Sequence, residues 1–326
     1  MLFKLIESLV VATVAFQLVP GSWTPVAYDP EALAPEIIRG EIVWSESLPK
    51  AGDIAVAALP KADEIPEPMK INKESLGIKT TASNVIVADL ATGKILFEKN
   101  ADEPRSIASI TKLMTALVFL DNNPGWDEMI TVKNALTIGN NNFYAGERVK
   151  AKDLFNSALV GSDNTAARNL AYATGMNMDE FIIKMNEKAQ AMELDEASFV
   201  DPVGLDPKNQ ASALDVIKIL RSTVEYEEVL AATTKKAHEF RSVSGDYHYI
   251  KTTNDLLSSF INKKPYAVIA GKTGSLLAAG YCLAMVVEND GHAVLIVSLN
   301  SESDGARFQD VKSLAYWVFE NYEWPE

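Results

Sequence analysis

Three short groups of residues combine hydroxyl, amine and amide side chains in an order that suits nucleophilic catalysis. They are Ser109-Ile-Thr-Lys112, Ser162-Asp-Asn164 and Lys272-Thr-Gly274. A serine hydroxyl attacks a carbonyl group efficiently only when a neighbouring base takes its proton. A lysine becomes such a base when burial among apolar side chains lowers its pKa. Together the groups indicate an enzyme with a serine nucleophile and a lysine base.

The spacing of the first group allows its two reactive side chains to meet. Ser109 and Lys112 begin a run with apolar residues at helical spacing, which predicts that both lie on one face, about 5–6 Å apart. Near a helix start, backbone N–H groups and the helix dipole favour negative charge on an attacked carbonyl. The competing interpretation is an ordinary helix cap followed by a solvated lysine. Ser47-Leu-Pro-Lys50 repeats the pattern, but its proline-rich surroundings provide no helix to align the pair.

The elements that must position these groups follow from the apolar patterns. Two strand-like runs joined by Ala91-Thr92-Gly93 predict a hairpin before Ser109, and the periodicity over 133–236 is mainly helical. Three further runs predict a strand meander, followed by a closing helix. The expected strands are 84–90, 94–99, 266–273, 280–287 and 292–299, and the expected helices include 152–173, 179–192 and 305–322. Along the chain, strands come first, helices follow and strands return near the end. This order indicates an α+β fold.

The N-terminal quarter of the chain has a different character. Lys4 and an apolar stretch over 9–16 predict a signal peptide or an N-terminal membrane anchor over residues 1–19, and therefore an exported protein. Eight of the 14 prolines lie between Pro20 and Pro68, a density that opposes helix and sheet. Residues 20–77 are therefore predicted to be a proline-rich linker, with a short uncapped helix over 36–43 as a lesser alternative. The catalytic domain is expected over 78–326.

The net charge and the histidine and cysteine residues argue against several classes of function. The net charge of −14 argues against a nucleic-acid partner, because phosphate binding requires clustered lysine and arginine. The three histidines lack the spacing of a zinc-protease helix, so no metal or other cofactor is expected. The single cysteine, Cys282, lies in an apolar run and is interpreted as a buried small side chain.

The three groups in this order are also a known signature of penicillin-binding proteins and class A β-lactamases. From about Ser83 to Tyr322 the sequence resembles the serine D-alanyl-D-alanine carboxypeptidases, the low-mass penicillin-binding proteins. The resemblance extends beyond the three groups and includes Phe199-Val-Asp-Pro-Val-Gly-Leu205, Thr253-Asn254-Asp-Leu-Leu257 and Gly271 to Tyr281. It implies a β-lactamase/transpeptidase-like fold, in which an antiparallel sheet is flanked by helices and carries an inserted helical lobe.

The resemblance implies a role for each residue of the site. Ser109 is the nucleophile, Lys112 its base, and Ser162 relays a proton to the leaving amine. Among the substrate-binding residues, Asn164 holds a backbone amide and Lys272 supplies positive charge, while Thr273 binds the terminal carboxylate. The backbone N–H groups of Ser109 and Ser275 form the oxyanion hole, and Gly274 leaves room for the substrate. The implied partners are peptidoglycan stem peptides, with β-lactam antibiotics as inhibitors.

Several alternatives remain open at this point. A class A-like β-lactamase needs a glutamate in a Glu-x-x-Leu-Asn loop after the second group, and no such string follows Asn164. A D,D-endopeptidase would use the same acyl-enzyme as a carboxypeptidase, and a non-catalytic wall-binding module would keep only the fold. Asp163 is interpreted as a structural hydrogen-bonding residue. Arg307 is interpreted as a residue on the surface of the last helix, with a cation of the cleft as the lesser alternative.

Overall fold

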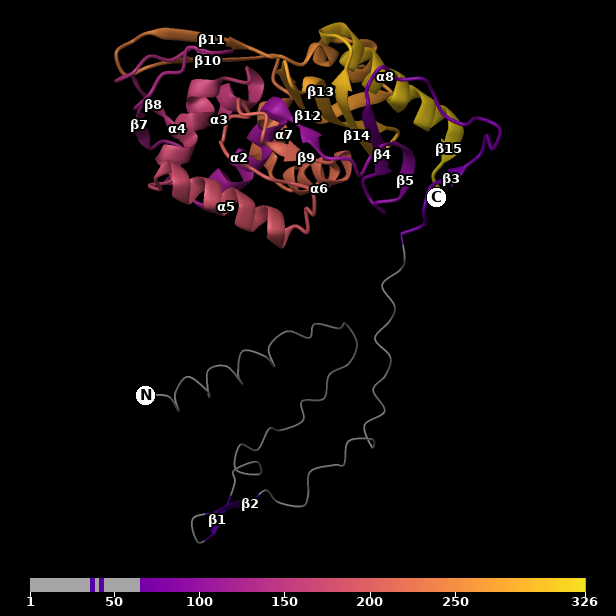
Figure 1. Cartoon of the computed structure of the whole chain (residues 1–326), viewed down its shortest axis with the longest axis horizontal. Coiled ribbons are helices and arrows are strands. Elements are labelled where there is room, and N and C mark those ends of the chain that lie inside the picture. The colour runs from indigo at the N-terminus through magenta and orange to yellow at the C-terminus, as the bar shows by residue number, and fades with distance from the viewer. Residues whose placement is uncertain (1–35, 39–40, 44–64, 326) are drawn as a thin grey trace, which may run out of the picture. The chain divides into compact units, whose positions relative to one another are not determined.

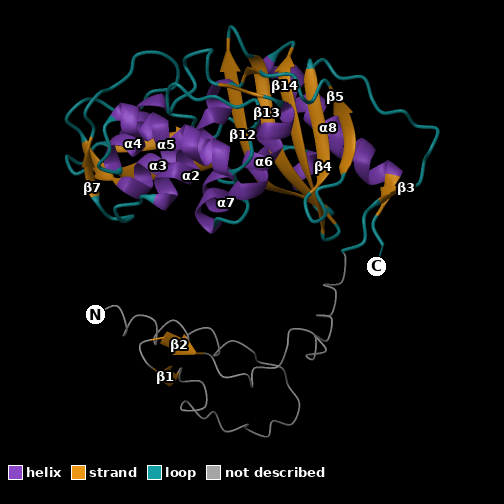
Figure 2. Cartoon of the chain, turned by 60° about the horizontal axis from the view of Figure 1, so that its bottom comes forward, coloured by secondary structure: helices purple, strands orange, loops and turns teal. Residues whose placement is uncertain are grey.

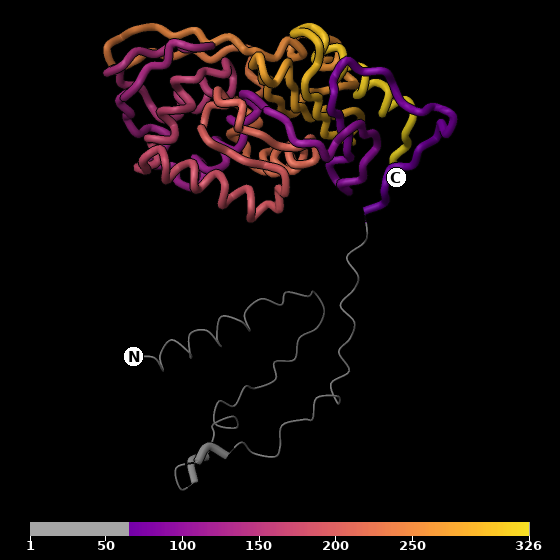
Figure 3. Tube along the Cα trace, viewed as in Figure 1, coloured from indigo at the N-terminus to yellow at the C-terminus, as the bar shows by residue number. Residues whose placement is uncertain are grey.

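The main sheet of the molecule joins segments from both ends of the domain. The computed structural model describes residues 36–38, 41–43 and 65–325. Five antiparallel strands follow the order β12-β13-β14-β4-β5 (Figures 1 and 2). Their bounds are β4 (Asn84–Asp89), β5 (Ile95–Lys99), β12 (Tyr266–Leu276), β13 (Gly280–Asn289) and β14 (His292–Ser301). The predicted hairpin and the predicted meander therefore form one sheet, joined where β14 pairs with β4 (Figure 3).

The two faces of this sheet build two separate cores. Successive side chains of a strand point to opposite faces, so neighbours in β14 enter different cores. Val294 and Ile296 pack with α8 (Asp304–Asn321), whereas Leu295 and Val297 pack with the core that includes α6 (Ala213–Thr223). Because both faces are covered by helices, β14 is a nearly continuous apolar run.

A helical lobe is inserted between β5 and β12 and lies beside the β12 edge of the sheet (Figures 1 and 2). Its main helices are α2 (Thr111–Asp121), α3 (Ala151–Val160), α4 (Asn164–Ala173), α5 (Met178–Ala191) and α7 (Glu227–Thr233). The predicted α+β fold, with an antiparallel sheet, flanking helices and a helical lobe, is confirmed. The single helix predicted over 152–173 is wrong, because α3 and α4 are separated at 161–163.

Short strand pairs that the helical periodicity does not predict complete the lobe. They are β6 (Arg105–Ser106) with β9 (Gln210–Ala211), β7 (Met129–Thr131) with β8 (Arg148–Lys150), and β10 (Ala237–Arg241) with β11 (Tyr247–Lys251). The β6–β9 pair matters for the site, because the next backbone N–H, that of Ile107, donates to the carbonyl oxygen of Asn209 at 3.1 Å. This contact holds the chain just before Ser109.

The predicted linker over 20–77 is wrong at its C-terminal end. There β3 (Met69–Lys70) pairs with β15 (Tyr322–Glu323), which follows α8 directly (Figure 1). The indole N–H of Trp317 donates to Ser75 Oγ at 2.8 Å. A two-residue strand carries too little pattern to be recognised among prolines, so this packing escapes sequence analysis.

The remaining N-terminal predictions concern residues of which little is described. Two short strands, β1 (Glu36–Ile38) and β2 (Glu41–Val43), pair antiparallel, so the alternative of a helix over 36–43 is wrong. The predicted signal peptide or anchor over residues 1–19 lies outside the described residues. In the part of the chain that the structure describes, no helix has the length and apolarity required to span a membrane.

Candidate active site

Ser109 lies in a tight turn that two glycines allow to approach its neighbours closely. The turn is the 3-10 helix η1 (Ala108–Ile110), which leads directly into α2. Ala108 has a φ of +47°, a left-handed conformation that a residue with a side chain adopts at a cost. A Cβ atom on Gly274 would lie 3.2 Å from the Ser109 nitrogen, and one on Gly204 would lie 2.0 Å from the Ala108 carbonyl oxygen. Both positions require glycine so that β12 and the 199–210 segment can pack against the turn.

Lys112 is buried directly beside the Ser109 hydroxyl. Its side chain is 1% exposed, and its Nζ atom lies 2.8 Å from each of three oxygens, namely Ser109 Oγ, Asn164 Oδ1 and the Val203 carbonyl. Burial lowers the pKa of Lys112 to about 7, although the negative charges of Asp163 and Asp201 oppose this shift. Near neutral pH a large fraction of this amine is therefore uncharged.

An uncharged Lys112 has the hydrogen-bonding capacity that a base needs here. The neutral amine has two N–H donors and one lone pair, and Asn164 Oδ1 and the Val203 carbonyl can only accept. Those two acceptors take the two N–H groups, which leaves the lone pair facing Ser109 Oγ at 2.8 Å. This arrangement turns the lone pair toward the serine proton. The predicted contact between nucleophile and base is present.

The second group lies at a helix boundary instead of within one helix. Ser162 joins α3 to α4 with a φ of +55°. Asp163 is the N-cap of α4, where its carboxylate accepts hydrogen bonds from the Ala166 N–H at 2.7 Å and from the backbone and side-chain N–H groups of Asn142 at 2.7 and 2.8 Å. Because these donors occupy the carboxylate, Asp163 acts as a structural residue, as predicted. It fixes the strained turn that aims Ser162 and Asn164.

Lys272 brings the second and third groups together. Its buried Nζ atom donates to Ser162 Oγ at 2.8 Å and to the Thr273 carbonyl at 2.9 Å. Burial lowers the pKa of Lys272 well below its ordinary value, and the positive charges of Lys112 and Arg307 add to the shift. Lys272 is 1% exposed and is a hydrogen-bond partner of Ser162, while its burial works against the positive charge expected from the sequence. Because Ser162 Oγ accepts from this amine, its own proton is free to be donated elsewhere.

Two hydroxyl groups lie on the β12 side of the site. The Oγ1 atoms of Thr273 and Thr253 are 2.5 Å apart. Ser275 follows on the same strand, is exposed, and pairs in register with Tyr281. The edge of β12 thus presents Thr273, Gly274 and Ser275 in sequence beside the turn that carries Ser109.

Arg307 is buried, and its prediction as a surface residue is wrong. Its side chain is 6% exposed and donates to the carbonyl oxygens of Gly274 at 2.9 Å and of Cys282 at 3.4 Å, and it forms an ion pair with Asp304. The guanidinium therefore holds the backbone of β12 at the point where Gly274 meets Ser109. Helical periodicity places Arg307 on α8 but does not predict that β12 and β13 offer it carbonyl groups.

The segment that contributes the Val203 carbonyl is ordered by Asp201. The Asp201 carboxylate accepts from the backbone N–H groups of Val203 at 2.6 Å, Gly204 at 2.7 Å and Asp206 at 2.8 Å, and from Asn209 Nδ2 at 2.7 Å. No reactive side chain marks this contribution in the sequence. The available signal is the Asp-Pro-Val-Gly run, which is typical of a turn. Gly204 adopts a φ of +85°, as such a turn requires.

Cys282 is buried, as predicted. Burial raises the pKa of its thiol to about 11, so it is not a nucleophile. Within residues 65–325, no cluster of three or more histidine, cysteine, aspartate or glutamate side chains could hold a metal ion. The alternative pair Ser47 and Lys50 lies outside the described residues.

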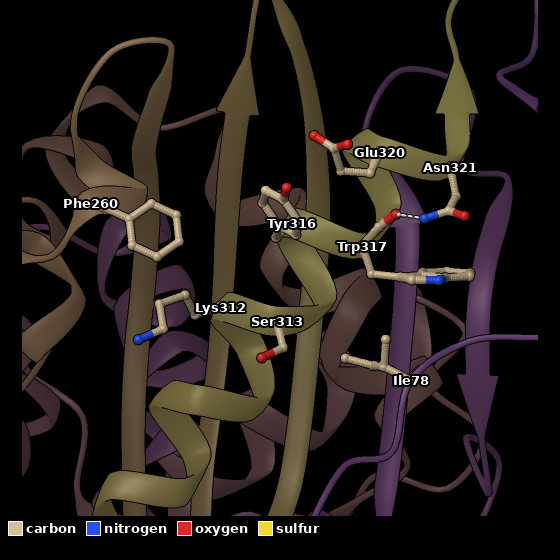
Figure 4. Close-up of a pocket in the computed structure, with 8 residues that line it drawn as sticks. All are labelled: Ile78, Phe260, Lys312, Ser313, Tyr316, Trp317, Glu320 and Asn321. Atoms are coloured by element: carbon tan, nitrogen blue, oxygen red, sulfur yellow. Dashed lines mark hydrogen bonds between the residues drawn. The ribbon is translucent and has the colours of Figure 1, made fainter. Parts of the chain in front are cut away.

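Two hollows on the molecule differ in their relation to this site. One, of about 450 Å³, is formed by α4, α5 and the 200–207 segment and includes Val203, whose carbonyl contacts Lys112. The other, of about 460 Å³, lies along α8 (Figure 4). Figure 4 shows it between Phe260, Tyr316 and Ile78, and none of its lining residues belongs to the three groups. The first hollow therefore shares Val203 with the surroundings of Lys112, and the second shares no residue with them.

Comparison with known proteins agrees with this geometry. The family model for D-alanyl-D-alanine carboxypeptidase matches residues 69–303. The chain is 30% identical to the D-alanyl-D-alanine endopeptidase of Pseudomonas aeruginosa over 73% of this chain and 77% of that one. It is 26% identical to the D-alanyl-D-alanine carboxypeptidase DacF of Bacillus subtilis over 74% and 63%, respectively.

A solved structure supports the same conclusion. Penicillin-binding protein D2 from Listeria monocytogenes, in its cefotaxime-bound form, superposes with a TM-score of 0.65 at 27% identity, covering 75% of this chain and 100% of that one. The family match, the fold and the contact between Ser109 and Lys112 all agree with a serine peptidase. The chain belongs to the D-alanyl-D-alanine carboxypeptidase family, whose members are serine peptidases that act on peptidoglycan.

Proposed function

We propose that the protein cleaves the bond after the penultimate D-alanine of peptidoglycan stem peptides, as a D-alanyl-D-alanine carboxypeptidase. The observation that carries this proposal is the 2.8 Å contact between Ser109 Oγ and the buried amine of Lys112, whose pKa is lowered to about 7. Lys112 takes the proton of Ser109 as the oxygen attacks the D-alanyl carbonyl. General-base assistance of this kind typically contributes about 10²–10⁴-fold in rate.

The remaining residues of the site support the later steps. Ser162, which accepts a hydrogen bond from Lys272, donates its own proton to the leaving amine. Thr273, together with its hydroxyl neighbour Thr253, receives the carboxylate of the leaving D-alanine. The backbone N–H groups of Ser109 and Ser275 stabilise the oxyanion, and loss of one such donor typically costs about 10²–10³-fold in rate. Water then hydrolyses the ester on Ser109.

Asn164 holds the peptide amide on the acyl side of the cleaved bond. Its Oδ1 atom accepts from Lys112, and its Nδ2 group donates to the Ile138 carbonyl at 2.7 Å. A carboxamide has two N–H donors and two lone pairs, so each end keeps one position for a substrate. The substrate amide therefore binds without displacing the contacts that orient the base.

A second candidate function is D,D-endopeptidase activity on cross-linked peptides. It is favoured by the 30% identity to the Pseudomonas aeruginosa protein, which is named an endopeptidase. Both reactions use the same acyl-enzyme, and both leaving groups can carry a carboxylate next to the leaving amine. The contacts at Thr273 and Lys272 therefore do not separate them.

The two activities are separated by giving the full chain both substrates. We expect release of free D-alanine from a stem pentapeptide ending in D-Ala-D-Ala, faster than cleavage of a cross-linked stem-peptide dimer. Faster cleavage of the dimer would assign the endopeptidase function instead. Ser109→Ala provides the control for both, because either activity requires the same nucleophile.

The β-lactamase alternative receives no support from the site. Among the described residues, no glutamate side chain hydrogen-bonds to Ser109, Lys112 or Asn164. A penicillin's leaving amine also stays tethered to the acyl group, so water has poor access to the ester. We expect a burst of about one equivalent of hydrolysed penicillin followed by slow release, whereas sustained rapid hydrolysis without D-alanine release would identify a lactamase.

We also propose that the protein works outside the cytoplasmic membrane, where peptidoglycan stem peptides are found. The support is the apolar stretch over 9–16 after Lys4, which is typical of an export signal or an N-terminal anchor. Cell fractionation of the full chain tests this proposal. Recovery in the periplasm or with the membrane supports it, and recovery in the cytosol contradicts it.

A further inference from the structure

The β10–β11 hairpin has one face packed on the helical lobe and one face open to solvent. On the inner face, His238 contacts the Asp153 carboxylate of α3 at 3.0 Å, and the rings of Phe240 and His248 stack with their centres 4.6 Å apart. Because successive side chains of a strand point to opposite faces, the residues between these point outward. Figure 1 shows the two paired strands along one border of the lobe. The inner contacts hold the outer face in place.

The outer face combines exposed tyrosines with positive charge. Tyr247 and Tyr249 are 54% and 56% exposed, and as alternate residues of β11 they lie about 7 Å apart on one side of the strand. The guanidinium of Arg241 lies 5.3 Å from the centre of the Tyr247 ring, and the Tyr247 hydroxyl donates to Glu239 at 2.7 Å. Lys251 is exposed on the same face. Two cations therefore accompany one carboxylate here, on a chain whose net charge is −14.

The strand that carries the tyrosines leads directly to the active site. β11 ends at Lys251, and two residues later the Thr253 hydroxyl lies 2.5 Å from that of Thr273. Tyr249 precedes Thr253 by four positions, so their Cα atoms are at most about 14 Å apart. A stem peptide that reacts with Ser109 at its fourth residue spans at most about the same distance back to its sugar. The glycan strand that carries a bound stem peptide is therefore within reach of Tyr249.

Resting on the function proposed above, we propose that the outer face of the hairpin binds the glycan strand of peptidoglycan. The faces of a sugar ring present C–H groups, which the negative face of a tyrosine ring attracts. Tyrosine supplies this contact area at a low cost in conformational entropy. Arg241 and Lys251 complement the carboxylates of neighbouring stem peptides. A lipid surface fits less well, because Glu239, the cross-strand partner of Tyr249, would lose its hydration there.

Binding of glycan strands freed of their stem peptides tests this surface without any turnover. The full-length protein, Tyr247→Ser, Tyr249→Ser and the double variant are each titrated with the soluble strands by isothermal titration calorimetry. We expect each single change to weaken binding about fivefold, the scale of one aromatic stacking contact, and the double change to weaken it more than about tenfold. Tyr316→Ser, which changes a similarly exposed tyrosine on α8, is the matched control and should bind like the wild type.

Turnover of two substrates separates the surface from the catalytic site. The double variant should release D-alanine from a soluble stem pentapeptide at the wild-type rate, because no residue of the site is changed. On intact peptidoglycan below saturation we expect it to work about tenfold more slowly, because the glycan strand no longer holds stem peptides near the site. Circular dichroism checks that the variant is folded.

The outcomes separate this proposal from the proposed function. The glycan-binding surface would be overturned if the wild type bound no glycan strands or if the double variant bound them equally well. It would also be overturned by an equal loss on both substrates, or by a loss of binding to anionic phospholipid vesicles in place of glycan. If the wild type released no D-alanine but bound glycan through the two tyrosines, only the peptidase function would be overturned.

Discussion

Two buried basic side chains lie near β12, and burial has different consequences for their charges. Lys112, on the helical-lobe side, is surrounded by neutral oxygens and has its pKa lowered to about 7. Arg307, on the α8 side, has a carboxylate partner in Asp304 and donates to two backbone carbonyls. Burial lowers the pKa of Arg307 as well, but a guanidinium stays protonated across the working range of proteins.

The two residue types differ in whether they can release a proton, and each suits its position. An amine can give up its proton and regain it, so burial makes Lys112 a base. A guanidinium cannot, so burial makes Arg307 a permanent donor that fixes the Gly274 carbonyl. Between them lies Gly274, whose missing side chain lets β12 approach the Ser109 nitrogen. Arg307 thus fixes the backbone of β12, and Lys112 contacts the nucleophile beside it.

The largest effect in this comparison is expected from Lys112→Met. The variant keeps an unbranched apolar side chain of similar length but removes the lone pair that faces Ser109. We expect the rate of acylation by penicillin to fall by at least 10²–10⁴-fold, the usual contribution of a general base. Stopped-flow or labelling kinetics measure this rate, and circular dichroism checks the fold. Acylation at the wild-type rate would show that the base is another group.

The pH dependence of acylation also tests the assignment of Lys112 as the base. The base must be uncharged, and the pKa of Lys112 is lowered to about 7, so activity is low below this pH and is gained as the pH rises through it. We expect kcat/KM for acylation to increase through about pH 7 and then level off. A rate that stays flat between pH 5 and 9 would contradict an ionising lysine in this role.

A smaller effect is expected at Arg307, because it acts on the backbone and not on the substrate. Arg307→Met removes the donor to the Gly274 carbonyl, and we expect acylation to slow by about tenfold, the scale of a charged hydrogen bond. The pH midpoint near 7 should remain, since Lys112 is untouched. Lys312→Met, on the same helix, is the matched control. A loss as large as that of Lys112→Met would place Arg307 in the chemistry itself.

The smallest effect on activity is expected from shortening the N-terminus. A chain that begins at Ile78 lacks β3 and the partner of the Trp317 indole, whereas one that begins at Ile65 keeps both. Loss of about 2 kcal/mol of such contacts lowers the Tm of a domain this size by roughly 4–8 °C. Thermal unfolding of the two chains measures this difference, and penicillin labelling should be alike in both. Equal Tm values would restore the prediction that the linker extends to residue 77.

The parts of the site that depend on local geometry are predictable from the sequence. Ser109 and Lys112 are three residues apart at a helix start, and helix geometry alone brings them into contact. The sheet is predictable for a similar reason, because long apolar strands and the Asn289-Asp290-Gly291 turn are strong local signals. These predictions need no knowledge of how distant segments pack.

The parts that depend on distant segments are not predictable in this way. The hydrogen bond between Lys272 and Ser162 joins residues 110 positions apart, and the motif over 199–205 does not show that the Val203 carbonyl contacts Lys112. Arg307 shows the same limit, because its burial depends on carbonyls of β12 and β13. Ser162 departs from the predicted helix because a positive φ, stabilised by the Asp163 cap, aims its hydroxyl at Lys272.

The most direct test of the account is to locate the acyl group on the protein. The full chain is incubated with penicillin, digested and analysed by mass spectrometry. We expect one equivalent of penicilloyl adduct on Ser109 and none on the Ser109→Ala protein. An adduct on Ser162 or on Ser47, or undiminished labelling of the Ser109→Ala protein, would contradict the assignment of the nucleophile.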